Sequence, residues 1–201
     1  MVLVVTVDQR GSRRSPDLVP GLLASLADVP AVRAFDQTAG DEVQGVLDDP
    51  AALATVVERL LRQDAWHVGV GAGPVERPLP ETARAGRGPA YVHARAAVTA
   101  AKTSPWHLRV LAGENAAAEA RALETVLWLW AVVLSRRTAR GWEVADLVAE
   151  GLSYDETATR LGISPSAVSQ RAQAAGIVEG RRARELATDL ARRLIEREGT
   201  T

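Results

Sequence analysis

The chain has 201 residues, of which 47% are hydrophobic and 24% charged, with no cysteine and a formal net charge of −1. This composition is typical of a globular protein with one large or two small domains, and it excludes disulfides and thiolate metal sites. Positive and negative charges also nearly balance within residues 1–112 and within residues 113–201, which argues against strong nonspecific binding to nucleic acid.

The beginning of the chain does not resemble a secretory leader, because the apolar run after Met1 reaches Asp8 too soon. The most apolar run, Val126–Leu134, is far shorter than the roughly 20 residues that span a bilayer. We therefore expect a cytoplasmic protein with no membrane partner.

The first 112 residues alternate between predicted strands and helices. Runs of β-branched or alternating apolar residues predict strands, and apolar residues three or four apart predict helices. The predicted strands are Val2–Val7, Val32–Gln37, Val43–Leu47, Trp66–Ala72 and Trp106–Leu111, and the predicted helices are Asp17–Ala27, Pro50–Gln63 and Pro89–Ala101. The order begins βαββαβ, which is a ferredoxin-like pattern and predicts an α+β domain.

Acidic residues stand where two of these strands end. Asp8 closes the first strand within Asp8-Gln9-Arg10-Gly11-Ser12, and Asp41 lies in the hairpin run Thr38-Ala39-Gly40-Asp41-Glu42. If the strands are neighbours, the two carboxylates converge on one sheet edge, where they could hold Mg²⁺. Backbone amides of the first run could also cradle a phosphate. Both runs also suit plain turns, because Asp, Gly and Ser favour turns.

Three segments carry a resemblance to a known family: Val5–Ser12, Phe35–Gly45, and Val68–Pro74 followed by Gly88–Arg95. Together they resemble the SatD family and, more distantly, the class III nucleotide cyclase fold, over about the first 110 residues. The resemblance implies a cyclase-like fold that binds a metal ion or nucleotide. The residues it implies, together with the two acidic runs, are Asp8, Arg10, Gly11, Ser12, Gly40, Asp41, Glu42 and Arg95.

Two positions depart from the cyclase pattern. Tyr91 replaces the expected Asn, and Gln37 replaces the expected Lys. Both lost donors would neutralise developing phosphoryl charge, so the resemblance implies binding of a nucleotide or small phosphate ligand rather than rapid turnover.

Residues 113–140 predict a connecting helix, over Asn115–Arg137. Its segment Val126–Leu134 is apolar on every face, which predicts either burial on all sides or an interface. We expect a homodimer that uses Trp128 and Trp130.

Residues 141–201 contain a predicted helix-turn-helix, with helices at Tyr154–Arg160 and Pro165–Ala175. Gly162 suits a turn that needs positive φ, and Ser164 followed by Pro165 is a strong helix start. The region resembles the region-4-like and MarR-type modules of bacterial regulators, and a closing helix is predicted at Glu185–Glu196. The predicted DNA contacts are Ser164, Ser166, Ser169, Gln170, Arg171, Gln173, Arg181 and Arg182.

Three functions fit these features. The first is a bacterial transcriptional regulator that binds DNA through residues 141–201 and a ligand through residues 1–112. The second is an enzyme that acts on nucleotides with Mg²⁺ at Asp8 and Asp41. The third is a non-catalytic adaptor that uses the apolar helix for assembly.

Overall fold

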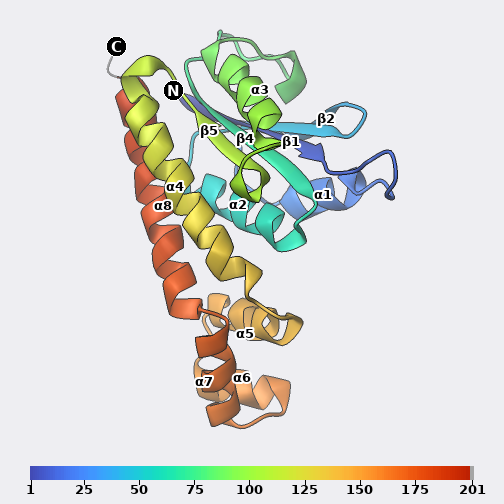
Figure 1. Ribbon diagram of the computed structural model, residues 1–201, viewed down its shortest axis with the longest axis vertical. Helices are drawn as coiled ribbons and strands as arrows, with labels where there is room; N and C mark the ends of the chain where they lie inside the picture. The colour runs from blue at the N-terminus through green and yellow to red at the C-terminus, as the bar shows by residue number, and fades with distance from the viewer. Residues whose placement is uncertain (200–201) are drawn as a thin grey trace. The chain divides into compact units, whose positions relative to one another are not determined.

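The computed structural model describes residues 1–199 and has an α+β fold built on a five-stranded mixed sheet, which confirms the predicted class (Figure 1). The chain divides into two units, one formed by Met1–Trp128 with Leu186–Thr201 and the other by Leu129–Glu185. This differs from a division at residues 112 and 140, because helices α4 (Ala117–Ser135) and α8 (Ile177–Glu198) each contribute to both units.

The sheet belongs to the first unit and has the order β2-β3-β1-β4-β5. Its strands are β1 (Val2–Gln9), β2 (Arg33–Ala39), β3 (Glu42–Leu47), β4 (Trp66–Gly73) and β5 (Leu108–Leu111). The β4–β5 pair is parallel and the other pairs are antiparallel. The apolar, β-branched β1 occupies the centre, where neighbours on both sides and helices on both faces bury it.

Helices cover both faces of the sheet. Helices α1 (Val19–Leu26) and α2 (Pro50–Gln63) lie on one side and α3 (Pro89–Ala101) on the other (Figure 1). The bounds predicted for α2 and α3 are confirmed. Helix α2 starts where the Asp49 carboxylate accepts a hydrogen bond from the Ala51 amide at 2.8 Å, and proline fills its first position.

Helix α3 rests directly on the backbone of β4. A Cβ atom placed on Gly71 would lie 2.2 Å from the Ala94 amide nitrogen, and one on Gly69 would lie 2.2 Å from that of Val98. The alternating glycines of β4 therefore form a flat floor on one face of the sheet, as residues two apart in a strand share a face. Small Ala90 and Ala94 on the facing side of α3 complete this close approach.

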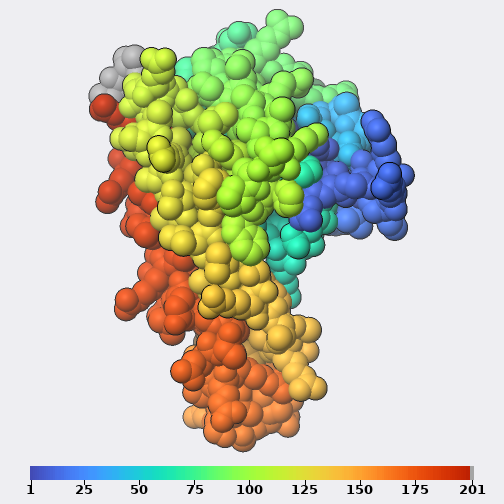
Figure 2. All heavy atoms as spheres, in the orientation of Figure 1, coloured from blue at the N-terminus to red at the C-terminus, as the bar shows by residue number. Residues whose placement is uncertain are grey.

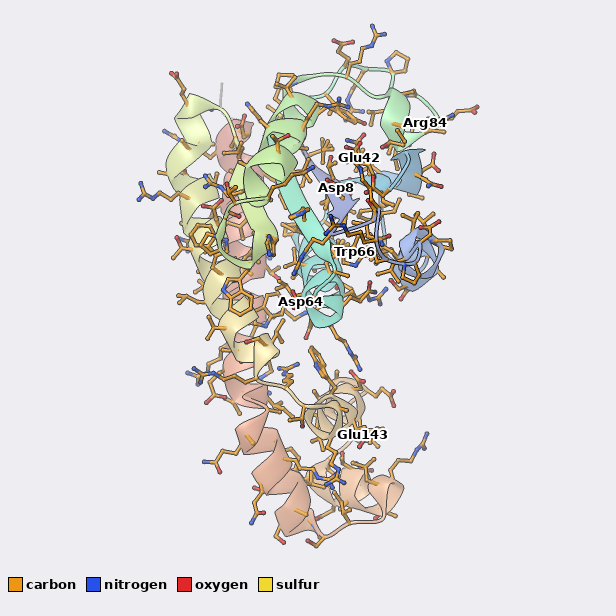
Figure 3. The ribbon with its side chains drawn as sticks, turned by 45° about the vertical axis from the view of Figure 1, so that its right-hand side comes forward. Asp8, Glu42, Asp64, Trp66, Arg84 and Glu143 are labelled. Atoms are coloured by element: carbon orange, nitrogen blue, oxygen red, sulfur yellow. The ribbon has the colours of Figure 1, made fainter. Side chains whose placement is uncertain are left out.

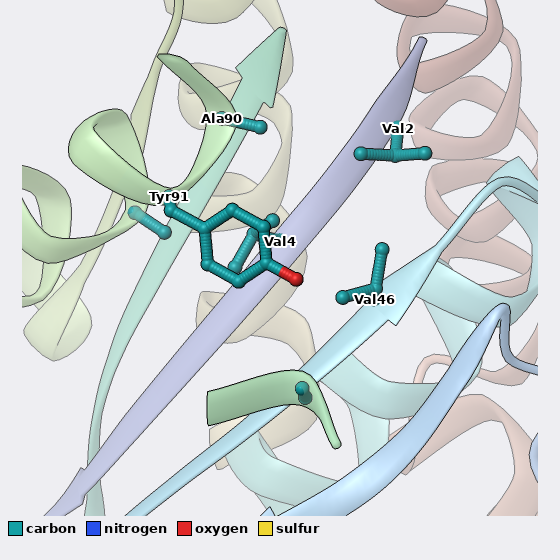
Figure 4. Close-up of a cluster of buried hydrophobic side chains, with 7 residues drawn as sticks. Val2, Val4, Val46, Ala90 and Tyr91 are labelled. Carbon is teal, nitrogen blue, oxygen red and sulfur yellow. The ribbon is translucent and has the colours of Figure 1, made fainter. Parts of the chain in front are cut away.

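Beside this floor, α3 contributes to an apolar cluster with the neighbouring strands (Figure 4). Val2 and Val4 of β1 and Val46 of β3 pack with Ala90 and Tyr91 of α3. Tyr91, which stands where cyclases have an Asn, is only 8% exposed, so its ring serves the core.

Two predicted elements differ clearly from their bounds in the structure, while several others differ by only a few residues at their ends. The expected strand at Trp106–Leu111 begins only at Leu108, because Trp106 and His107 adopt left-handed φ values of 56° and 50°, which a strand does not accommodate. The expected closing helix at Glu185–Glu196 is the last part of α8, which begins at Ile177.

Helix α4 covers the free edge of β5. The Glu124 carboxylate accepts a hydrogen bond from the Val110 amide at 2.9 Å, and the Trp128 indole donates to the Leu108 carbonyl at 2.9 Å. Two side chains one helical turn apart thus satisfy an exposed strand edge. Over the described residues, no helix combines the length and apolarity needed to cross a membrane.

The second unit contains α5 (Ala139–Ala149), α6 (Tyr154–Leu161) and α7 (Pro165–Ala174). Val144, Ala158, Val168 and Ala172 form their common core. Local signals fix the turn, as predicted: Gly162 has φ 65°, and the Ser164 hydroxyl accepts a hydrogen bond from the Ala167 amide at 3.2 Å.

The glycine floor predicts opposite effects for two Gly→Ala substitutions. Gly71→Ala should lower the free energy of unfolding by about 1–3 kcal/mol or more, because its Cβ must push α3 off the sheet. Gly21→Ala, in α1 with nothing within 4 Å of the added Cβ, should raise it by up to about 1 kcal/mol. Chemical denaturation of both variants measures the difference, and equal effects would contradict the close packing of α3.

Candidate functional site

A pocket of about 1110 Å³ opens in the first unit, where the end of β1, the β1–α1 loop, the β2–β3 hairpin and α3 meet. In Figure 3, the labelled Asp8, Glu42 and Arg84 gather in this region, and Figure 2 shows the blue surface of the early loop next to the green surface of α3. Six of the eight predicted ligand-binding residues line the pocket: Asp8, Gly11, Ser12, Asp41, Glu42 and Arg95.

The other two predicted residues do not line it. The Arg10 guanidinium forms an ion pair with Asp64, at 2.7 Å between Nη1 and Oδ1, and also donates to the Asp64 carbonyl. Gly40 supplies the hairpin turn with a positive φ of 56°. Its carbonyl accepts a hydrogen bond from the Gln37 amide at 2.5 Å, so both residues serve the local turn.

Strand register aligns three of the lining side chains. Asp8 pairs with Glu42 across β1 and β3, and with His67 across β1 and β4. Residues directly opposite each other in neighbouring strands project from the same face of a sheet. Glu42, Asp8 and His67 therefore form a row across three strands, on the face that α3 covers.

Sequence reasoning missed Lys102, the only lysine of the chain. It caps the C-terminus of α3 and forms an ion pair with Asp8, at 2.6 Å between Nζ and Oδ2. Arg95 lies seven residues earlier, two helical turns away on the same side of α3, and both line the pocket. The spacing of Arg95 and Lys102 can be read from the sequence, whereas the direction in which α3 crosses the sheet cannot.

The acidic and basic groups of the pocket are electrostatically linked. The Ser12 hydroxyl lowers the pKa of Asp41 by hydrogen bonding, and the backbone amide of Asp41, the Asp8 side chain and the charge of Lys102 act in the same direction. The hydrogen bond to Asp8 raises the pKa of Lys102, and the charges of Asp8, Asp41 and Glu42 raise it further. Near neutral pH, Asp41 and Lys102 are therefore both charged.

His67 forms an uncharged wall of the pocket. Burial lowers its pKa, and neighbouring His107 adds to this effect. The two rings meet edge to face with centroids 4.9 Å apart. His67 therefore stays neutral at physiological pH.

Basic residues outnumber acidic ones around the pocket. Its lining holds the five basic residues Arg13, Arg14, Arg84, Arg95 and Lys102 against the three acidic residues Asp8, Asp41 and Glu42. Within residues 1–199, no three His, Cys, Asp or Glu side chains gather closely enough to suggest a metal site. An anionic ligand suits this charge pattern better than a lone metal ion.

In the second unit, α7 presents a polar face. Ser166, Ser169, Gln170 and Gln173 are exposed at i, i+3, i+4 and i+7, while Val168 faces the core. The capping hydroxyl of Ser164 also lies 2.9 Å from that of Ser166. Of the predicted arginines, Arg171 is half-buried, whereas Arg181 and Arg182 on α8 are exposed.

Comparison with protein-family models, with curated proteins and with solved structures finds no match to this chain. The roles of the pocket and of α7 therefore rest on geometry and chemistry.

The hydrogen bond at Asp41 yields a measurable prediction. Ser12→Ala should raise the pKa of Asp41 toward its ordinary value of 3.8, because the largest cause of its lowering is lost. In the wild type, the lowered pKa of Asp41 adds to the free energy of unfolding at pH values above its ordinary pKa. This contribution disappears as the pH falls through the pKa of Asp41 in the folded state. Carboxyl carbon shifts followed by NMR against pH measure the change. Ser15→Ala in the same loop is the control and should leave the Asp41 titration unchanged.

Proposed function

We propose that this protein is a cytoplasmic bacterial regulator that binds DNA through the helix-turn-helix of its second unit and a phosphate-bearing ligand through the pocket of its first unit. The observation that carries the proposal is the polar face of α7. Its four exposed side chains carry both donors and acceptors, while the helix is fixed from behind by Val168 and Ala172.

The geometry around α7 is suited to a helix that contacts DNA bases in the major groove. A major groove admits an α-helix whose exposed side chains reach base edges, and Gln can form two hydrogen bonds with adenine. Gln170 lies in the middle of the exposed face. Arg181 and Arg182 are exposed in the same unit and are suited to phosphate contacts.

For the first unit we propose a ferredoxin-like fold of the cyclase or SatD type. The order β2-β3-β1-β4 with antiparallel pairing is the arrangement that a βαββαβ chain adopts in that fold, and β5 extends it in parallel. This proposal covers the fold and the class of ligand but not cyclase turnover. The residues that replace the catalytic Asn and Lys have other roles here, since Tyr91 packs in the core and Gln37 hydrogen-bonds within its own turn.

The ligand class follows from the pocket. Guanidinium groups form paired hydrogen bonds with phosphate oxygens, and four arginines line the pocket from three separate segments. A volume of about 1110 Å³ is ample for a nucleotide.

We also propose that the regulator acts as a homodimer, as DNA readers with one recognition helix per chain commonly do. Trp130 is fully buried and Trp128 donates to β5, so neither indole is free for such an interface. Leu129, which is 63% exposed between them, is an apolar side chain of α4 that remains available.

Two substitutions separate base reading from phosphate binding. Gln170→Ala should weaken binding to the operator by about 1–3 kcal/mol and relax specificity, because it removes a base-edge contact. Arg182→Ala should weaken binding to all DNA sequences alike. It should also lower the salt dependence of binding, because a protein with one fewer phosphate contact releases fewer counterions from the DNA. Fluorescence anisotropy with the gene's own upstream DNA and with random DNA, at two salt concentrations, measures both effects.

Arg192→Ala is the matched control, since its guanidinium is exposed and pairs with Asp189, 2.6 Å away on the same helix. It should leave DNA binding unchanged. Equal and undetectable binding of wild type to both DNAs would reject the regulator and favour a protein-contact role for the helix-turn-helix.

A further inference from the structure

The ammonium group of Lys102 faces all three acids of the pocket. It pairs directly with Asp8, and the charges of Asp41 and Glu42 also stabilise its protonated form. These are the carboxylates that a divalent cation would need. The Lys102 ammonium group thus supplies to these carboxylates the positive charge that a metal ion would otherwise supply.

The residues present do not fit a resident divalent ion. Asp8 has a side chain only 18% exposed, and its carboxylate is already paired at 2.6 Å. A divalent ion at Asp8 would have to displace the ammonium or lie beside it, against like-charge repulsion. Within residues 1–199, no three His, Cys, Asp or Glu side chains gather closely enough to hold an ion by themselves, so a magnesium ion would depend on waters and phosphates for most of its octahedral ligands.

The remaining charges point to the ligand. The pocket lining holds Lys102, three acids and four arginines, so its formal charges sum to about +2. The arginines are Arg13, Arg14, Arg84 and Arg95. An ammonium group has three donors, and the Asp8 contact uses one of them. Two donors are left for phosphate oxygens.

We infer that the pocket binds a nucleoside polyphosphate without a divalent metal ion, with Lys102 as a built-in cation that bridges the acidic row and the phosphates. This inference rests on the proposed function, because it specifies the class of the phosphate-bearing ligand and how it is held. It also accounts for the lysine itself, which is 53% exposed and whose ion pair is therefore of little use to the fold.

The test is calorimetry of the full chain with ATP, GTP and inorganic tripolyphosphate, each in excess EDTA and in excess Mg²⁺. We expect the dissociation constant of the best nucleotide to differ by less than about tenfold between the two conditions. Lys102→Met should weaken binding in EDTA by about tenfold or more, and Mg²⁺ should then restore it, because the freed carboxylates can take the ion. Lys102→Arg should retain binding in EDTA.

Arg87→Met, which removes an exposed positive charge outside the pocket lining, is the matched control and should bind as wild type does. Wild-type binding that appears only with Mg²⁺ would overturn the inference and leave the phosphate-binding function standing. Unweakened binding by Lys102→Met in EDTA would overturn it as well. Binding of no probe in either condition would reject both the inference and the proposed ligand class.

Discussion

The contact between α3 and the glycine floor of β4 determines where the candidate site lies. Because Gly69 and Gly71 have no Cβ atom, the backbone of α3 approaches the strand more closely than any side chain would permit. This approach sets both the height and the direction of the helix. Two turns separate Arg95 from Lys102, so the direction of α3 decides that the lysine arrives above the end of β1, within reach of Asp8. A larger residue on the floor would shift Arg95 and Lys102, the two basic residues that α3 brings to the pocket.

The ion pair at the end of β1 contributes little to holding the fold together. Exposed ion pairs are worth roughly 0–1 kcal/mol, and more than half of the Lys102 side chain is accessible to solvent. The apolar cluster behind it, with Val4 and Ala94 fully buried, supplies far more. The pair therefore matters mainly for electrostatics, since it places a cation beside a largely buried carboxylate and within reach of a ligand. Residues of α3 that pack in the core, such as Ala94, thus differ from Arg95 and Lys102, which line the pocket.

The sequence predicted those parts of the site that depend on local pattern. Asp8 and Asp41 meet because Asp8 lies at the end of β1 and Asp41 directly precedes β3, the neighbour of β1 in the sheet. Lys102 was missed because its partner lies 94 residues earlier and only the packing of α3 brings the two together. Arg10, which the sequence suggested for the site, lies outside the pocket lining, since Asp64, at the left-handed end of α2, offers it both a carboxylate and a carbonyl. No local pattern reveals either long-range pairing.

In the second unit, by contrast, nearly every signal is local. Caps at Ser153 and Ser164 and the left-handed Gly162 specify the two helices and their turn within about a dozen residues. Charge contributes less, because Leu129–Glu185 contains eight arginines and seven acidic residues. If this unit binds DNA as proposed, its near-neutral charge gives little affinity from counterion release, and base contacts would have to supply most of it. One polar helix face covers only a few base pairs, and two copies of the chain on a two-fold site would double both the contacts and the length of sequence that is read.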